Sequence, residues 1–262
     1  MLSNVILTCL LAAVCPASDS GDAAARRPDD KRPHVVLVSF DDEYQSSKTL
    51  PQFAQQLHER FGVVGTVLVG NAQDGFRGLV DELKTADALV VFVRRKALPQ
   101  PQLDAIRAHL DAGKPLVALR TASHAFAVGG KLPPGTAVWP SFDPDVLGGS
   151  YHGHYGHGHA TQVSLAPQAA GHPILAGVKI EGWASMGSLY KTSPVKKDAT
   201  VLLMGTWEKS TEPLAWTRQY GTARVFYTSL GHPDDFRSPQ FTQLLTNALF
   251  WAMDRRVPAS AK

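Results

Sequence analysis

Residues 113–126 have the sequence Gly-Lys-Pro-Leu-Val-Ala-Leu-Arg-Thr-Ala-Ser-His-Ala-Phe, and this stretch decides the fold. The segment 113–115 is a helix-stop signal, and the four apolar residues Leu116–Leu119 are typical of a buried strand. A polar run, Arg120–His124, begins where that strand ends. Because ligands bind outside the carboxyl ends of the strands in an open parallel sheet, this run is predicted to lie at a functional edge.

Short apolar strands alternate with amphipathic helices on the N-terminal side of this stretch. Strands are predicted at 34–40, 63–69, 88–93 and 116–119, and helices at 50–61, 79–85 and 100–112. This alternation predicts a parallel sheet with helices on both faces.

The pattern changes after a loop over 129–149 that is rich in Gly and Pro. Gly221-Thr222 then separates two strands and is a hairpin signal. Strands are predicted at 161–165, 185–190, 200–206, 213–220 and 223–230, and a last amphipathic helix at 240–254.

The composition is that of an ordinary globular protein. The 262 residues are 44% hydrophobic and 19% charged, enough to bury the core of one large domain or of a domain with a substantial insertion. The net charge is only +3, and the basic residues are dispersed apart from short runs such as Arg94-Arg95-Lys96. No nucleic-acid partner is therefore expected.

The N-terminus has the pattern of an export signal. An apolar run at 5–14 is too short to span a bilayer, and small residues follow it, with cleavage expected after Ala17 or Ser18. The protein is therefore expected to be periplasmic or secreted, without a stable membrane span. The predicted organisation is a signal peptide at 1–18, a polar linker at 19–33 and one domain at 34–256.

Both cysteines lie in this predicted signal peptide. The mature chain would then have no thiol, and hence no disulfide, no thiolate metal site and no cysteine nucleophile. A lipoprotein signal favours a small residue before its cysteine, and Val14 precedes Cys15, so lipidation of Cys15 is the less favoured alternative.

Two side chains of the polar run, Ser123 and His124, are candidates for chemistry. A serine-hydrolase pair is disfavoured, because sequence neighbours rarely face each other as nucleophile and base and no Gly-x-Ser-x-Gly pattern surrounds Ser123. Two interpretations stay open. His124 binds a ligand, or Ser123 caps the following turn and His124 bonds to the backbone.

A His-rich segment, Tyr-His-Gly-His-Tyr-Gly-His-Gly-His, occupies residues 151–159. In an extended chain His152 and His154 would point to the same side, as would His157 and His159. Two imidazoles at that spacing can share a divalent metal such as zinc. A third ligand would come from elsewhere, and the alternative is that these histidines bind solvent or sugar hydroxyls. The candidates for the third ligand are His124, His232 and Asp234.

Polar residues also follow the first and the last predicted strands of the parallel sheet. His232, Asp234 and Asp235 suit general acid–base catalysis or the binding of sugar hydroxyls, although either aspartate can instead cap the next helix. The acidic run 41–44 follows the first strand and has the same ambiguity.

Four stretches, 41–44, 113–126, 148–155 and 217–236, together resemble the ThuA-like (trehalose-utilisation) family, over about His34 to Asp254. The resemblance implies an α/β fold: a flavodoxin-like three-layer parallel sheet, like that of class I glutamine amidotransferases, with additional C-terminal strands. In those amidotransferases the fourth strand leads into an elbow cysteine, and Arg120 takes its place here. Arginine stays protonated and cannot act as that nucleophile, so glutamine hydrolysis is excluded. Its fork of donors can instead hold a carboxylate or a sugar oxygen.

The resemblance also implies a carbohydrate substrate of the trehalose or keto-sugar type. The expected reaction is hydrolysis or lyase cleavage of a glycoside derivative, and the alternative is a non-catalytic sugar-binding module. A small-molecule carbohydrate is the expected partner, and a homodimer is a further expectation. Trp183, Trp207 and Trp216 are candidates for a stacking face, although tryptophans in strands are more often core. The candidate residues are His124, His232, Asp234 and Asp235 for catalysis; Arg120, Ser123, Asp42, Glu43, Tyr44 and Tyr151 for substrate binding; and His152 and His154 for the metal.

Overall fold

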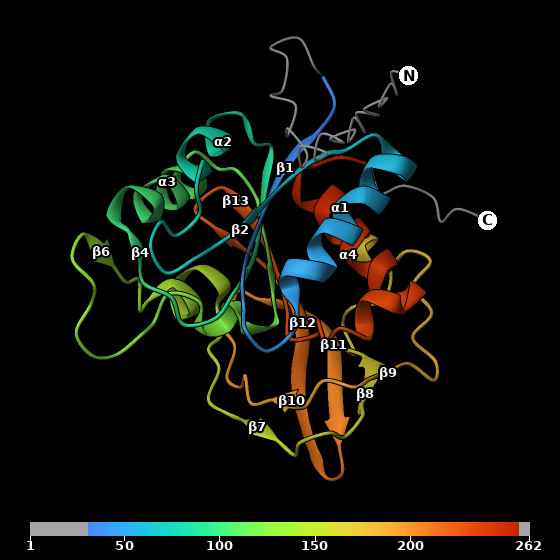
Figure 1. The fold of residues 1–262 in the computed structure, drawn as a ribbon. Coiled ribbons are helices and arrows are strands. Elements are labelled where there is room, and N and C mark those ends of the chain that lie inside the picture. Colours follow the sequence, from blue (N-terminus) through green and yellow to red (C-terminus); the bar gives the residue numbers. More distant parts are fainter. Residues whose placement is uncertain (1–30, 257–262) are drawn as a thin grey trace, which may run out of the picture. The chain divides into compact units, whose positions relative to one another are not determined.

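The structure, a computed structural model, describes residues 31–256 and contains a nine-stranded mixed sheet (Figure 1). The strand order is β2-β1-β3-β5-β13-β12-β11-β8-β9. The first five of these pair in parallel, and their order is that of a flavodoxin-like sheet. These five are β1 (His34–Phe40), β2 (Val64–Val69), β3 (Ala88–Val93), β5 (Leu116–Leu119) and β13 (Ala223–Thr228).

Helices cover both faces of this parallel half, which confirms the predicted three-layer α/β fold. Apolar residues of α1 (Ser46–Phe61) and α4 (Pro239–Ala252) pack in one buried cluster, and those of α2 (Leu79–Thr85) and α3 (Gln100–Asp111) in another. Figure 1 shows the two pairs on opposite sides of the strands. β1 is buried from His34 to Ser39, because alternate side chains of Val35–Val38 enter the two clusters.

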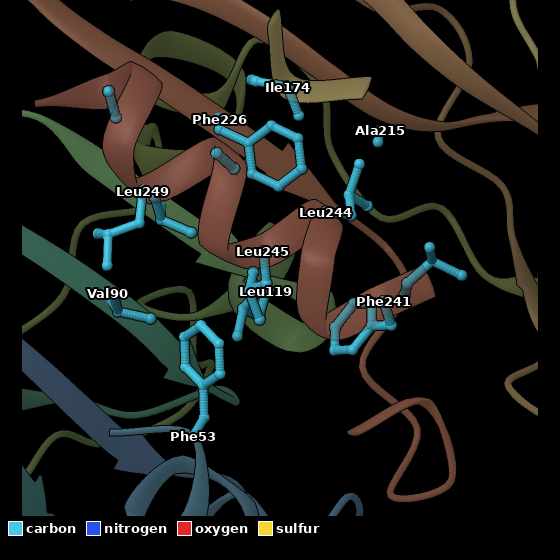
Figure 2. Packing of buried hydrophobic residues seen from close by; sticks show 14 of the residues in the cluster. Phe53, Val90, Leu119, Ile174, Ala215, Phe226, Phe241, Leu244, Leu245 and Leu249 are labelled. Carbon is cyan, nitrogen blue, oxygen red and sulfur yellow. The ribbon is translucent and has the colours of Figure 1, made fainter. Parts of the chain in front are cut away.

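Figure 2 shows the core under α4. Leu245 on α4 lies over Leu119 of β5, with Phe226 of β13 nearby, and all three side chains are almost completely buried. Phe53 of α1 closes the same cluster. The C-terminal helix therefore covers the strand that ends at the polar run.

The antiparallel half supplies the predicted additional strands. The hairpin at Gly221-Thr222 is confirmed, since Tyr220 pairs with Ala223 and Gly221 has a φ of +57°. The remaining strands of the sheet are β12 (Ser210–Tyr220), β11 (Thr200–Trp207), β8 (Thr161–Leu165) and β9 (Ala184–Ser185).

The strand predicted at 185–190 is wrong as one piece. The chain forms β9, breaks at 186–188, and resumes as β10 (Leu189–Tyr190), which pairs with β7 (His154–Tyr155) in a separate two-stranded sheet. The break includes Gly187, which packs directly against a side chain of the polar run, as described below.

Other differences are small. The helix predicted at 50–61 begins four residues earlier, at Ser46. A short antiparallel pair, β4 (Leu98–Pro99) with β6 (Thr136–Ala137), and a π-helical turn, Phe142–Leu147, were not predicted.

The predicted signal peptide and most of the predicted linker lie outside the described residues. Across residues 31–256, no helix combines the length and the apolar character needed to cross a membrane.

Candidate functional site

Four parallel strands, β1, β3, β5 and β13, end at one edge of the sheet, and a polar segment follows each of them. The site at this edge is built from 41–44, 94–96, 120–124 and 231–237, together with β10 and residues 151–157 of the His-rich segment.

The turn after β5 keeps the geometry of a nucleophile elbow but carries an arginine at its apex. Arg120 has a φ of +44°, a left-handed conformation that costs a non-glycine residue about 1–2 kcal/mol. Its carbonyl oxygen accepts hydrogen bonds from Tyr227 Oη at 2.8 Å and Ser123 Oγ at 3.1 Å. The buried Ser123 hydroxyl is therefore used inside the turn.

The Arg120 guanidinium contacts two tyrosine rings. Its Cζ is 4.1 Å from the centre of the Tyr44 ring and 4.4 Å from that of Tyr190. Nη1 donates to Ser229 O at 2.6 Å, Nη2 donates to Tyr44 Oη at 3.1 Å, and the residue is only 1% exposed. Nε has no hydrogen-bond partner among the described residues.

The charge of Arg120 is held without an ion pair to a carboxylate in the part of the chain that the structure describes. Burial alone would lower its pKa, but the nearby tyrosine hydroxyls and Asp235 outweigh burial, so the pKa lies above its usual value. Arg120 is therefore a permanent cation stabilised by cation–π contacts and carbonyl oxygens.

His124 sits beside this cation and is neutral. Burial, with the positive charges of Arg95, Arg94 and Arg120, lowers the pKa of His124 to about 3. The residue is 9% exposed, and its ring centre lies 4.5 Å from that of Tyr151. Within residues 31–256 its Nδ1 is buried and has no hydrogen-bond partner, so the ring keeps an unsatisfied polar atom.

The segment after β13 separates the roles of its two aspartates. Asp235 is 2% exposed, and its Oδ2 accepts hydrogen bonds from Gly231 N at 2.8 Å, His232 N at 2.9 Å and Ser185 Oγ at 2.9 Å. Burial raises the pKa of Asp235 in spite of these donors. Asp235 therefore holds the backbone of the turn, a structural role rather than a catalytic one.

Asp234 and His232 form a more accessible pair. His232 Nδ1 accepts a hydrogen bond from Asp234 N at 3.3 Å and lies 3.5 Å from Asp234 Oδ2, and the Asp234 carboxylate also pairs with Arg237. The His232 ring is 6.3 Å from the Tyr44 ring, on which Arg120 stacks. Burial lowers the pKa of His232 despite the two neighbouring aspartates, so its imidazole can accept a proton at neutral pH.

The predicted acidic residues after β1 lie at the rim. Asp42 pairs with Lys96 Nζ at 2.7 Å, and Glu43 pairs with Arg94 Nη2 at 2.7 Å, which ties the ends of β1 and β3 together. Asp41, which was not among the candidates, accepts a hydrogen bond from Tyr44 N at 2.6 Å and so positions that tyrosine.

The His-rich segment is not the extended strand assumed from its sequence. Only His154 and Tyr155 are in a strand, and Gly153 and Gly156 have φ values of +118° and +62°. His154 Nδ1 lies 2.6 Å from Tyr151 Oη, and His154 Nε2 lies 3.1 Å from His157 Nε2. The structure thus pairs His154 with His157 rather than with His152.

The divalent metal stays a prediction. Among the described residues, no group of three or more His, Cys, Asp or Glu side chains is arranged to hold an ion. The exposed His152 is anchored through its backbone N–H, which donates to Lys191 O at 3.0 Å.

Two site residues escaped the sequence analysis. Tyr190, the second ring against Arg120, belongs to β10, and Gly187 lies so close that a Cβ on it would be 2.6 Å from Arg120 Nη1. The glycine in the middle of a predicted strand was the only available signal. Of the three tryptophans, Trp183 and Trp216 are buried in the core, and Trp207 is partly buried with its ring 5.3 Å from that of His159.

The sheet order and the elbow define a class: α/β proteins built like class I glutamine amidotransferases in which the nucleophile is replaced. The family model described as ThuA, trehalose utilisation, matches residues 35–252. The chain belongs to the ThuA family.

Solved structures agree with this fold. A putative ThuA-like protein from Bacteroides uniformis ATCC 8492 is 16% identical with a TM-score of 0.63, over 87% of this chain and 95% of that one. One from Parabacteroides merdae ATCC 43184 is 17% identical with a TM-score of 0.63, over 88% and 94%. A cytoplasmic protein from Salmonella typhimurium LT2 is 15% identical with a TM-score of 0.52, over 84% and 97%. No match is found among proteins with curated descriptions.

Proposed function

We propose that this protein cleaves a trehalose- or keto-sugar-type glycoside derivative, by hydrolysis or by a lyase reaction. One observation carries the proposal: a buried arginine cation without a carboxylate partner, beside a neutral histidine whose Nδ1 is unsatisfied in the described part of the chain. Such a site favours a substrate that develops negative charge on oxygen. The trehalose-utilisation family supports a sugar as that substrate.

His232 is the proposed general base. It takes a proton from the attacking water in hydrolysis, or from a carbon next to the keto group in a lyase reaction. Asp234, at 3.5 Å from Nδ1, stabilises the resulting imidazolium. Arg120 opposes the charge that develops on the substrate, and His124 offers Nδ1 to a hydroxyl.

A non-catalytic sugar-binding module is the second candidate. It is favoured by the pKa of about 3 at His124, which makes this imidazole a weak base. In that case His124 and Arg120 would bind hydroxyl groups without turnover.

The test is to incubate the protein with trehalose and 3-keto-glucosides, and to measure product formation and calorimetric binding. His232→Gln is expected to lower kcat by about 10²–10⁴-fold while binding persists. The control is His159→Ala, which removes an exposed ring outside the site. Full turnover by His232→Gln would refute the assignment of His232 as the base. If the wild-type protein binds these sugars without turnover, the second candidate is favoured. If the wild-type protein binds none of them, a carbohydrate ligand is refuted.

We also propose that the protein is exported, because small residues follow the apolar run at 5–14. Expression of the full chain in a Gram-negative host is expected to yield a periplasmic protein with a new N-terminus near residue 18. Full-length protein retained in the cytoplasm would refute export.

A further inference from the structure

A hydrogen-bonded chain runs from the site to the surface. Tyr151 Oη lies 2.6 Å from His154 Nδ1, and the other ring nitrogen of His154 lies 3.1 Å from His157 Nε2. Tyr151 and His154 are partly buried, whereas His157 is exposed. Because both nitrogens of His154 are engaged, this imidazole connects a phenol to an imidazole in contact with solvent.

The inner end of this chain belongs to the site. The Tyr151 ring centre is 4.6 Å from that of Tyr190, which stacks on Arg120, and 4.5 Å from that of His124. The Tyr151 backbone N–H donates to Ser123 O at 3.2 Å, in the turn after β5. The phenol is thus fixed to the same turn that holds the arginine.

The protonation states suit proton transfer. At their ordinary pKa values of about 10 and about 6.5, a tyrosine is a phenol and a histidine is mostly a neutral imidazole at neutral pH. A neutral imidazole has one N–H and one lone pair, so it can take a proton at one nitrogen and release one at the other. The charged and titratable groups facing the pair are Glu43, Tyr44, Arg95, Arg120, His157 and Lys191.

We propose that Tyr151, His154 and His157 form a proton relay, in which Tyr151 is the general acid of the site and recovers its proton from solvent. The use of the relay rests on the proposed cleavage reaction, because that reaction needs an acid for the departing sugar oxygen. The His232 ring lies 6.3 Å from that of Tyr44 and the Tyr151 ring 4.6 Å from that of Tyr190, so the proposed base and acid each adjoin one of the two tyrosines that contact Arg120.

Each transfer along the relay is balanced. As the bond from carbon to the departing oxygen breaks, its electron pair stays on that oxygen, which takes the proton of Tyr151 Oη. His154 Nδ1–H replaces that proton, His154 Nε2 takes one from His157 Nε2, and His157 takes one from water at Nδ1. One proton thus passes from solvent to product, and both imidazoles change tautomer.

Nitrogen NMR of the substrate-free protein tests the relay directly. One hydrogen between the two Nε2 atoms requires opposite tautomers, so when one ring carries its proton on Nε2 the other must carry it on Nδ1. Long-range ¹H–¹⁵N correlation spectra are expected to show His154 and His157 in opposite tautomers, and Tyr151→Phe is expected to shift the His154 Nδ1 resonance. The same tautomer in both rings would overturn the relay.

Kinetic measurements test whether the relay supplies protons to the cleavage reaction. His157→Ala is expected to lower kcat at least tenfold with little change in KM, and added imidazole is expected to restore the rate. His159→Ala, which removes an exposed histidine two residues away, is the matched control and is expected to leave kcat unchanged. A loss that imidazole does not rescue, or one no larger than the control's, would overturn the relay.

The two proposals fail in different ways. If the wild-type protein cleaves none of the sugars, the proposed function fails, and the tautomers still decide whether the chain exists. Titration with Zn²⁺ is a third arm, because two nitrogens 3.1 Å apart also suit one ion. Tight Zn²⁺ binding through the Nε2 lone pairs of both His154 and His157 would overturn the relay and support the predicted metal site.

Discussion

At the scale of single residues, the site depends on how Arg120 is enclosed. Two tyrosine rings and a backbone carbonyl surround the guanidinium, and Gly187 presses on it from the loop between β9 and β10. A side chain at 187 would occupy the space that Nη1 now fills. The absence of a Cβ there is therefore a requirement of the arginine.

Gly187→Ala is expected to displace the guanidinium and to destabilise the protein by about 1–3 kcal/mol, the usual cost of overpacking. Urea denaturation measures the loss. The matched control is Gly129→Ala, because a Cβ at the exposed Gly129 would meet no atom within 4 Å. Equal stability of the two variants would contradict this account of Gly187.

At the scale of elements, Glu212 of β12 ties the loop after β10 to the main sheet. This buried carboxylate accepts hydrogen bonds from Thr192 N at 3.2 Å and Ser193 N at 2.9 Å, and from Tyr155 Oη at 3.4 Å. Thr192 and Ser193 follow Tyr190 after one intervening residue, Lys191. Glu212 therefore holds the element that places a ring on Arg120.

Glu212→Ala leaves the N–H groups of the buried Thr192 and of Ser193 without an acceptor and is expected to cost about 1–3 kcal/mol, with a smaller loss for Glu212→Gln. Hydrogen exchange is the more specific measurement. The amide of Lys191, bonded to Gly153 O at 2.9 Å, is expected to exchange faster in the alanine variant. Unchanged exchange at Lys191, or an equal effect of Glu181→Ala at an exposed position, would count against this role.

At the scale of the whole molecule, two buried neutral histidines make the fold sensitive to acid. Burial is the main cause that lowers the pKa of His109 to about 4 and of His124 to about 3. Unfolded histidine has a pKa of about 6.5, so below that pH the unfolded chain binds more protons than the native one. Their contribution to stability is therefore complete above about pH 6.5 and declines as the pH falls toward 3.

His109→Gln isolates one of these contributions, because His109 lies on α3 with its Nε2 3.2 Å from Pro115 O, and a glutamine amide can still donate there. Between pH 6.5 and 4 the free energy of unfolding of the variant is expected to fall less steeply, by up to about 1.4 kcal/mol per pH unit. Urea unfolding across this range measures how steeply the free energy of unfolding changes with pH in the wild type and in the variant. The buried aspartates contribute equally to both proteins, so they do not affect the difference. Equal slopes would contradict the assignment.

Most of the fold was predictable because it depends on local patterns. The strands at 34–40, 88–93 and 116–119 and the helix at 79–85 have the predicted bounds, since continuous apolar runs and helical periodicity are properties of neighbouring residues. The carboxyl-edge location of Arg120 and His232 follows from the same patterns, because parallel strands end together.

The contacts within the site were not predictable in this way. The sequence by itself determined the α/β class and the common edge for the polar segments. Only the tertiary structure decided that Tyr190 stacks on Arg120, that Asp235 shapes a turn while Asp234 joins His232, and that His154 pairs with His157. The physical reason is that these contacts join segments far apart in the chain, or depend on left-handed glycines such as Gly153, whose backbone angles the residue type permits but does not specify.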